Sequence, residues 1–188
     1  MGSKTNKTSK SCRGWFYFVP LQCVYGENTF MATESKNKGF LNLPAYGAKV
    51  RRDGEMVQIF DALRGRWVRL TPEEWVRQHF VHYLAEGLGY PSAMMANEVA
   101  LEVNGTKRRC DSVVYERGSL RPLMIVEYKA PEVKLTQRVF DQICRYNMTL
   151  EVEHLIVSNG LQHFCCKVNL KEGSYAFMER IPRYEELL

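Results

Sequence analysis

Of all segments in this chain, Leu123–Lys129 restricts the possible folds most, because its run of apolar residues ends with two charged residues. In an extended strand, side chains alternate between two faces, so Glu127 and Lys129 share a face with Ile125. An unpaired charge is costly to bury. A strand that ends in this way predicts either a Glu–Lys ion pair at a sheet edge or a reactive site.

Turn signals and short apolar runs surround this segment. Asn104-Gly105 is a strong signal for a two-residue hairpin turn, and Asn159-Gly160 separates two further apolar runs. Strands are expected at residues 57–60, 67–70, 99–103, 107–115, 122–129, 155–157, 164–166 and 175–178. These patterns predict an α/β (α+β) fold with a central mixed β-sheet flanked by helices.

Two helices complete this prediction. The first begins after Thr71, which suits the N-cap, with Pro72 at the first helical position and Glu74 placed to close a capping box. Its apolar residues keep helical spacing, and we expect it to run to about residue 86. A second helix is expected at about residues 135–150, where apolar side chains recur at the spacing of a helix packed on a sheet.

The net charge of +5 is weak evidence for a nucleic-acid partner, since residues 1–40 contribute six Lys and Arg against two Glu. This segment predicts a disordered tail, or an over-extended start whose true initiator is Met31. Residues 41–188 form the predicted single domain and are nearly neutral, with 20 basic and 19 acidic residues. Three local basic clusters could contact phosphates or be solvated strand edges: Lys49, Arg51 and Arg52; Arg64, Arg66 and Arg69; Lys107, Arg108 and Arg109.

The six cysteines include no C-x-x-C pair and no Cys/His spacing that suits zinc. We expect reduced thiols in a cytoplasmic protein. No stretch of the sequence is long and apolar enough to span a membrane, so a membrane partner is not expected.

The return strand of the predicted hairpin carries a second carboxylate, Asp111. A register that pairs residues 116 and 122 would set Asp111 directly opposite Glu127. Opposed carboxylates repel each other unless a cation lies between them, and their hard oxygen atoms suit Mg²⁺ or Mn²⁺. A register shifted by one residue would send Asp111 to the other face and remove the site.

The second helix supplies a third element of this site. Gln142 and Tyr146 are four residues apart, so they share a helix face that borders the apolar stripe. A side-chain amide held there could reach the end of the Glu127 strand. The other interpretation is that Gln142 is a boundary residue and Tyr146 a core residue.

These residues together resemble the PD-(D/E)xK nuclease superfamily. Asp111 is followed by Glu127-x-Lys129 at the end of a strand and by Gln142-x-x-x-Tyr146 on the next helix. Within the superfamily, the chain is similar to the N-terminal nuclease domain of type I restriction enzyme R subunits over roughly residues 41–181. The supporting segments are Leu41-Asn42-Leu43-Pro44, Thr71-Pro72-Glu73-Glu74-Trp75-Val76-Arg77-Gln78, Val126-Glu127-Tyr128-Lys129-Ala130-Pro131, Gln142-Ile143-Cys144-Arg145-Tyr146-Asn147 and Ser158-Asn159-Gly160-Leu161.

The resemblance implies a restriction-endonuclease-like core with a metal-dependent site. Asp111 and Glu127, with the backbone carbonyl of Tyr128, would hold Mg²⁺ or Mn²⁺. Lys129 would orient or activate the attacking water and stabilise developing negative charge. Cys110 departs from the proline that precedes the aspartate in the superfamily motif. The implied reaction is hydrolysis of a DNA phosphodiester bond.

Three further residues receive implied roles. Gln142 and Tyr146 would support the site or the DNA backbone. Glu74 either corresponds to the acidic residue that many superfamily members carry on the first core helix, or serves only to cap its own helix.

The sequence departs from a complete R subunit because it contains no G-x-x-x-x-G-K-[ST] loop of a translocase motor. We therefore expect a magnesium-dependent DNA nuclease that acts alone or with a separate motor or specificity protein. The alternative hypothesis is a catalytically inactive DNA-binding or protein-interaction module of the same fold. A small-molecule enzyme is disfavoured, because the sequence offers no Gly-rich phosphate loop and no Ser-His or Cys-His arrangement.

Overall fold

The computed structural model describes residues 41–103 and 105–188, apart from the side chains of Val103, Arg145, Tyr146 and Met148. The predicted tail at residues 1–40, with its alternative start at Met31, lies outside the described residues.

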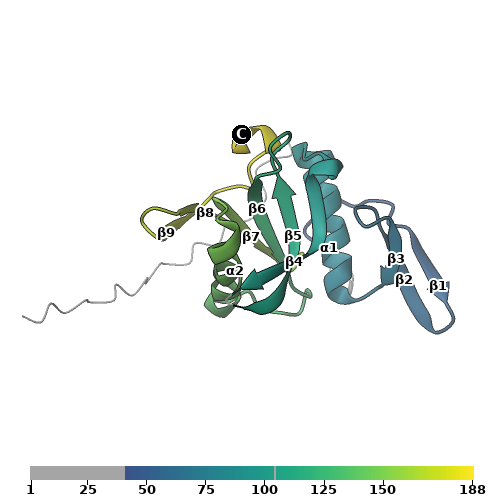
Figure 1. Ribbon diagram of the computed structural model, residues 1–188. Coiled ribbons are helices and arrows are strands. Elements are labelled where there is room, and N and C mark those ends of the chain that lie inside the picture. The colour runs from purple at the N-terminus through teal and green to yellow at the C-terminus, as the bar shows by residue number, and fades with distance from the viewer. Residues whose placement is uncertain (1–40, 104) are drawn as a thin grey trace, which may run out of the picture.

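A six-stranded mixed sheet forms the centre of the molecule, in the order β4-β5-β6-β7-β8-β9 (Figure 1). Its strands are β4 (Met95–Val103), β5 (Thr106–Tyr115), β6 (Pro122–Tyr128), β7 (His154–Ser158), β8 (His163–Asn169) and β9 (Ser174–Phe177). All neighbours are antiparallel except β6 and β7, which are parallel and joined through helix α2 (Gln137–Leu150). A parallel pair needs such a crossover connection. The predicted α/β fold with a mixed sheet is confirmed.

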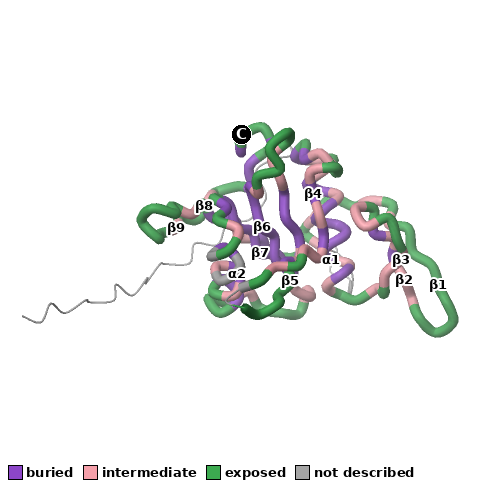
Figure 2. The backbone as a smooth tube through the Cα atoms, in the orientation of Figure 1, coloured by how far each residue is buried: buried purple, intermediate pink, exposed green. Residues whose placement is uncertain are grey.

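Two helices cover opposite faces of this sheet. Residues of α1 (Pro72–His82) share one apolar core with alternate residues of β6 such as Met124 and Val126. Residues of α2 share a second core with Ile125 and with Val157 of β7. Figure 2 shows the buried backbone concentrated along β6, β7 and the sheet-facing side of α1. The alternation of β6 therefore assigns Glu127 to the α2 side, as the sequence predicts.

Helix α1 begins as the sequence predicts, and its Thr71 hydroxyl accepts a hydrogen bond from the Glu74 backbone N–H at 3.0 Å. The predicted capping box is wrong in its second half. The Glu74 side chain forms ion pairs with Arg64 and Arg77, at 2.8 and 2.6 Å. The helix continues through a π-helical turn at Tyr83–Gly87, and short 3₁₀ helices lie at Ser92–Met94 and Tyr184–Leu187.

A separate three-stranded antiparallel sheet precedes α1 and stands off one side of the molecule (Figure 1). It consists of β1 (Val50–Asp53), β2 (Met56–Asp61) and β3 (Arg66–Arg69), and we call it the wing. The sequence predicts β2 and β3 but not β1. Helix α1 lies between the wing and the six-stranded sheet (Figure 1).

Among the described residues, Cys110, Cys165 and Cys166 are free thiols. Cys12 and Cys23 lie outside the described residues. Among the described helices, none has the length and apolar character required to cross a membrane.

Candidate active site

Glu127 lies at the carboxyl end of β6 and receives two hydrogen bonds on the same oxygen. Lys129 Nζ donates to Glu127 Oε1 at 2.7 Å, and Gln142 Nε2 of α2 donates to it at 2.6 Å. The Glu127 side chain is 4% exposed, whereas that of Lys129 is 20% exposed. Strand and helix thus converge on one buried carboxylate oxygen, and the predicted proximity of Glu127, Lys129 and Gln142 is confirmed.

Asp111 lies beside this group, but its surroundings differ from the prediction. The predicted pairing of residues 116 and 122 is wrong, because Tyr115 pairs with Pro122 and the register then shifts between Val114 and Tyr115. Beyond the shift, Ser112 pairs with Val126, and the next residues along the two strands are Asp111 and Glu127. Beyond the bulge the strands therefore keep the predicted register, in which residues 111 and 127 are level.

The pairing of β5 with β6 ends at this point, and the Asp111 carboxylate has hydrogen-bond partners other than Glu127. Its Oδ2 accepts a hydrogen bond from the Tyr128 backbone N–H at 2.8 Å, and its Oδ1 accepts one from Arg77 Nη2 at 2.8 Å. On the other side of β5, Glu98 of β4 takes a φ of +59° and also leaves the ladder. Asp111 consequently contacts α1, whereas Glu127 contacts α2.

Arg77 is the cation at the centre of the carboxylates on the α1 side. Its side chain is 4% exposed and forms ion pairs with Glu74, Glu98 and Asp111 at 2.6, 2.8 and 2.8 Å. Its guanidinium also lies 5.7 Å from the centroid of the Tyr128 ring. A buried arginine surrounded in this way fixes the positions of several carboxylates together, because its fork of donors is rigid.

The sequence-based prediction did not include Arg77, although the sequence contains a signal for it. Arg77 precedes Phe80 by three positions and Leu84 by seven, so it lies on the apolar stripe of α1. A cation on a stripe that packs on a sheet requires a buried anionic partner. The identity of that partner could not be read from the helix.

The pKa values of the site reflect burial and crowding of negative charge. Burial and the neighbouring charge of Asp111 raise the pKa of Glu127 to about 7. Burial also raises the pKa of Asp111, although the Arg77 charge and the Tyr128 N–H act in the opposite direction. Burial disfavours the Lys129 ammonium, but its hydrogen bond to Glu127 and the nearby carboxylates raise its pKa. A cation close to both carboxylates would favour their ionised forms.

The remaining predicted site residues are Glu74, Tyr146 and Tyr128. Glu74 is buried at the end of a chain of contacts in which Arg77 connects it to Asp111. Tyr146 belongs to α2, but its side chain lies outside the described part of the structure. Tyr128 follows Glu127 as the last residue of β6, and its backbone N–H donates a hydrogen bond to Asp111.

Residues 72–182 match the family model of the type I restriction enzyme R protein N terminus. The chain belongs to this family. Among solved structures, this R protein N-terminal domain is similar to a fragment assigned to an HsdR subunit of a type I restriction enzyme from Vibrio vulnificus YJ016, with a TM-score of 0.48 and 17% sequence identity. The similarity covers 63% of this chain and 24% of that chain. No curated protein matches the chain.

The family match contains every residue of the predicted site, whereas the wing precedes it. Among the described residues, no group of three His, Cys, Asp or Glu side chains is placed to hold a metal ion. A cation bound by this R protein N-terminal domain would therefore use two carboxylates and complete its shell with backbone carbonyl and water. Mg²⁺ is commonly bound in this way, through one or two carboxylates and several waters. The donor set fits such an ion.

Proposed function

We propose that this domain hydrolyses phosphodiester bonds of DNA with Mg²⁺ or Mn²⁺ held by Asp111, Glu127 and the backbone carbonyl of Tyr128. The observation that carries the proposal is the convergence of Lys129 and Gln142 on Glu127 Oε1, beside Asp111. Such an arrangement gathers two carboxylates and a cation at the carboxyl end of a parallel strand, where ligands of α/β sheets commonly bind.

The side chains of the site would divide the work of hydrolysis among them. A divalent ion bound there would polarise the scissile phosphate and lower the pKa of its bound water. Lys129 remains protonated because the neighbouring carboxylates raise its pKa, so its ammonium can stabilise negative charge that develops on the phosphate. Gln142 donates to Glu127 and holds that carboxylate at the end of β6.

Membership of the R protein N-terminal family supports a role in restriction, with DNA as the substrate. The other subunits of a type I restriction system are the proposed partners, including a motor or specificity protein. This chain covers 24% of the HsdR fragment to which it is similar. The partners of the whole R protein are therefore proposed for this chain.

A second candidate function is a DNA-binding or protein-interaction module without catalysis. One observation favours it: both oxygens of Asp111 already accept hydrogen bonds, from Arg77 and from the Tyr128 N–H. In this arrangement Arg77 satisfies the charge that a metal would otherwise neutralise. The two candidates differ in whether a divalent ion can bind beside Arg77.

Calorimetric titration of Mn²⁺ into the full chain tests this difference, followed by cleavage of supercoiled plasmid in Mg²⁺ or Mn²⁺. The informative variants are Glu127→Gln, which keeps the side-chain shape, and Lys129→Met, which keeps the aliphatic stem. We expect Glu127→Gln to lose both metal binding and cleavage. Lys129→Met should keep metal binding and lose at least about 100-fold in cleavage rate, as expected for loss of one electrostatic stabiliser.

Glu185→Gln is the matched control, because Glu185 is an exposed carboxylate of the 3₁₀ helix Tyr184–Leu187. It should bind Mn²⁺ and cleave DNA like the wild type. Cleavage retained by both Glu127→Gln and Lys129→Met would refute the nuclease assignment. Wild-type protein that binds DNA but neither binds Mn²⁺ nor cleaves would establish the inactive module.

A further inference from the structure

The wing presents basic and aromatic side chains on one of its faces. Its register aligns Lys49 with Phe60 and Trp67 across the three strands, since Phe60 pairs with Trp67 and its N–H bonds Lys49. Arg51 pairs with Gln58, and Gln58 pairs with Arg69. Because side chains two residues apart share a strand face, these two rows form a single surface. We call it the outer face of the wing.

Part of the opposite face of the wing packs against the rest of the molecule, although Val50, Arg52 and Arg66 on that face are exposed. Ile59 is fully buried, and the buried Asp61 carboxylate accepts a hydrogen bond from Asn97 of β4 at 3.0 Å. In contrast, Lys49, Arg51 and Arg69 on the outer face are exposed. Figure 2 shows the wing as largely exposed and intermediate, unlike the central sheet. The opposite face therefore anchors the wing to the molecule, whereas the outer face is open to solvent or to a ligand.

Positive charge is concentrated in the wing. Residues 49–69 hold six Lys and Arg against three Asp and Glu, a balance of +3, whereas residues 41–188 as a whole have 20 against 19. Arg64 is excluded from this surface, because it bonds Asp61 and pairs with Glu74. Arg52 and Arg66 lie on the opposite face of their strands. Asp53 and Glu55 lie at the β1–β2 turn, so the acidic residues of the outer face are confined to its tip.

The aromatic rings of the outer face hold its cations in place. The Arg51 guanidinium lies 4.4 Å from the centroid of Trp67, and the Lys49 ammonium lies 5.7 Å from that of Phe60. Arg51 Nε also donates to Gln58 Oε1 at 2.8 Å. Cations stacked on rings lose less side-chain entropy when they bind an anion, because they are already ordered. The rings are covered by charge and are poorly placed to stack on bases.

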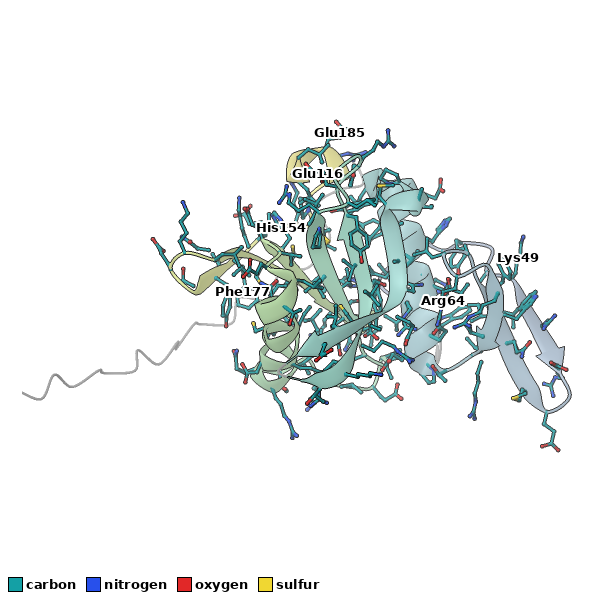
Figure 3. All side chains as sticks on the ribbon, viewed as in Figure 1. Lys49, Arg64, Glu116, His154, Phe177 and Glu185 are labelled. Atoms are coloured by element: carbon teal, nitrogen blue, oxygen red, sulfur yellow. The ribbon has the colours of Figure 1, made fainter. Side chains whose placement is uncertain are left out.

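The wing is connected to the candidate active site by a chain of polar contacts. Arg64, in the β2–β3 loop, bonds Asp61 and reaches Glu74 on α1, and Glu74 is paired with Arg77. Arg77 in turn holds Asp111 at 2.8 Å. Figure 3 shows Arg64 between the wing and α1, with Lys49 on the wing itself. The base of the wing is thereby fixed relative to the site.

We propose that the outer face of the wing binds the phosphate backbone of duplex DNA through Lys49, Arg51 and Arg69. Charge complementarity selects this partner, because Lys49 and Arg51, ordered on their rings, and the exposed Arg69 form a basic face that suits the phosphates of a DNA backbone. The inference rests on the proposed function for its choice of DNA. The family match begins at residue 72, so family membership does not assign this surface.

The test measures anisotropy of a dye-labelled DNA duplex bound by the full chain over a series of salt concentrations in EDTA. Arg51→Gln/Arg69→Gln should weaken binding and lower the slope of log K against log salt by about 1.8, since each lost phosphate contact removes about 0.9. Arg51→Lys/Arg69→Lys keeps the charges and should keep most of the slope. Thermal unfolding of each variant verifies that the wing remains folded.

Arg117→Ala/Lys171→Ala is the control of equal charge, because both residues are exposed and lie in turns of the six-stranded sheet. This variant should retain the wild-type slope. Equal slopes for the glutamine variant, the control and the wild type would overturn the proposal. So would a preference for single-stranded DNA that Trp67→Leu abolishes, since base stacking would then explain binding.

Plasmid cleavage in Mg²⁺, measured in parallel, separates this inference from the proposed function. If the wild-type protein cleaves DNA and Arg51→Gln/Arg69→Gln binds DNA as well as the wild type, the DNA-binding role of the wing is refuted and the nuclease assignment is not. If the substitutions in the wing weaken DNA binding but the wild-type protein does not cleave DNA, the DNA-binding role of the wing is supported and the nuclease assignment is refuted. Wild-type protein that fails to bind the duplex even at low salt refutes the wing.

Discussion

Arg77 Nη2 lies 2.8 Å from Asp111 Oδ1, which ties the middle of α1 to the strand that carries one half of the candidate site. The same guanidinium pairs with Glu74 and Glu98. Arg77 therefore stabilises a buried group of carboxylates, with Arg64 as a second partner of Glu74 and Arg109 as a second partner of Glu98. It also sets the local charge that an incoming metal ion would meet.

Replacing Arg77 with Met should destabilise the fold strongly. The substitution leaves Asp111 without its ion-pair partner in a poorly solvated environment and leaves Glu74 with Arg64 alone. Breaking a buried ion pair in this way costs about 3–5 kcal/mol. Urea denaturation measures the loss. Arg109→Ala is the control, because Arg109 also pairs with Glu98 but is 69% exposed. Exposed pairs contribute at most about 1 kcal/mol, so a comparable loss in both variants would contradict the central role of Arg77.

The pKa of Glu127 should respond in opposite directions to two substitutions. Its value of about 7 is raised by burial and by Asp111 and is held down by Lys129. Lys129→Met should therefore raise this pKa, and Asp111→Asn should lower it, each by about one unit or more. Carboxyl ¹³C chemical shifts recorded against pH in EDTA measure both changes. Shifts of the same sign would show that the two charges do not act on Glu127 as inferred.

His163 should reduce stability as the pH decreases from about 6.5 towards 4, whereas the raised pKa of Glu127 acts in the opposite direction over this range. Burial lowers the pKa of this histidine from 6.5 to about 4. Between these values the unfolded chain binds the proton and the folded chain does not, so up to about 3 kcal/mol present above pH 6.5 is lost. Burial also lowers the pKa values of His79 and His154, which add to the wild-type slope.

His163→Gln isolates the contribution of this residue. His163 Nδ1 contacts the Ser158 hydroxyl at 2.8 Å, and Nε2 contacts the Asn42 carbonyl at 3.0 Å. Free energies of unfolding from urea denaturation between pH 4 and pH 7 give the comparison. The variant should be less stable at pH 7 but should lose less stability than the wild type between pH 7 and pH 4. An unchanged slope would exclude His163 as a source of the pH effect.

Gly160→Ala should destabilise the turn after β7. Gly160 has a φ of +81°, and a Cβ placed there would lie 2.7 Å from Leu41 Cδ2 and 3.0 Å from Val76 Cγ2. Backbone strain alone costs about 1–2 kcal/mol for a residue with a side chain, and the contacts add to it. Thermal unfolding compares it with Gly173→Ala, where φ is +62° and nothing lies within 4 Å. Equal losses would show that crowding contributes nothing at Gly160.

The sequence by itself determined the features that depend on local chemistry and periodicity. Thr71 caps α1 because its hydroxyl reaches a backbone N–H three residues later. The alternation of β6 places Glu127 on the α2 side, and the spacing of α2 brings Gln142 to it. The hairpin signal around Gly105 joins β4 and β5, although Asn104 lies outside the described residues.

Only the tertiary structure decided how the carboxylates are paired. The bulge between Val114 and Tyr115 shifts the pairing next to the turn by one residue, and beyond it the strands keep the predicted register that brings Asp111 level with Glu127. Arg77 meets Asp111 across 34 positions of sequence. Strand β1 also escaped prediction, since all four of its residues are exposed and leave no apolar alternation. Local patterns specify elements, whereas contacts between distant charged groups depend on how those elements pack.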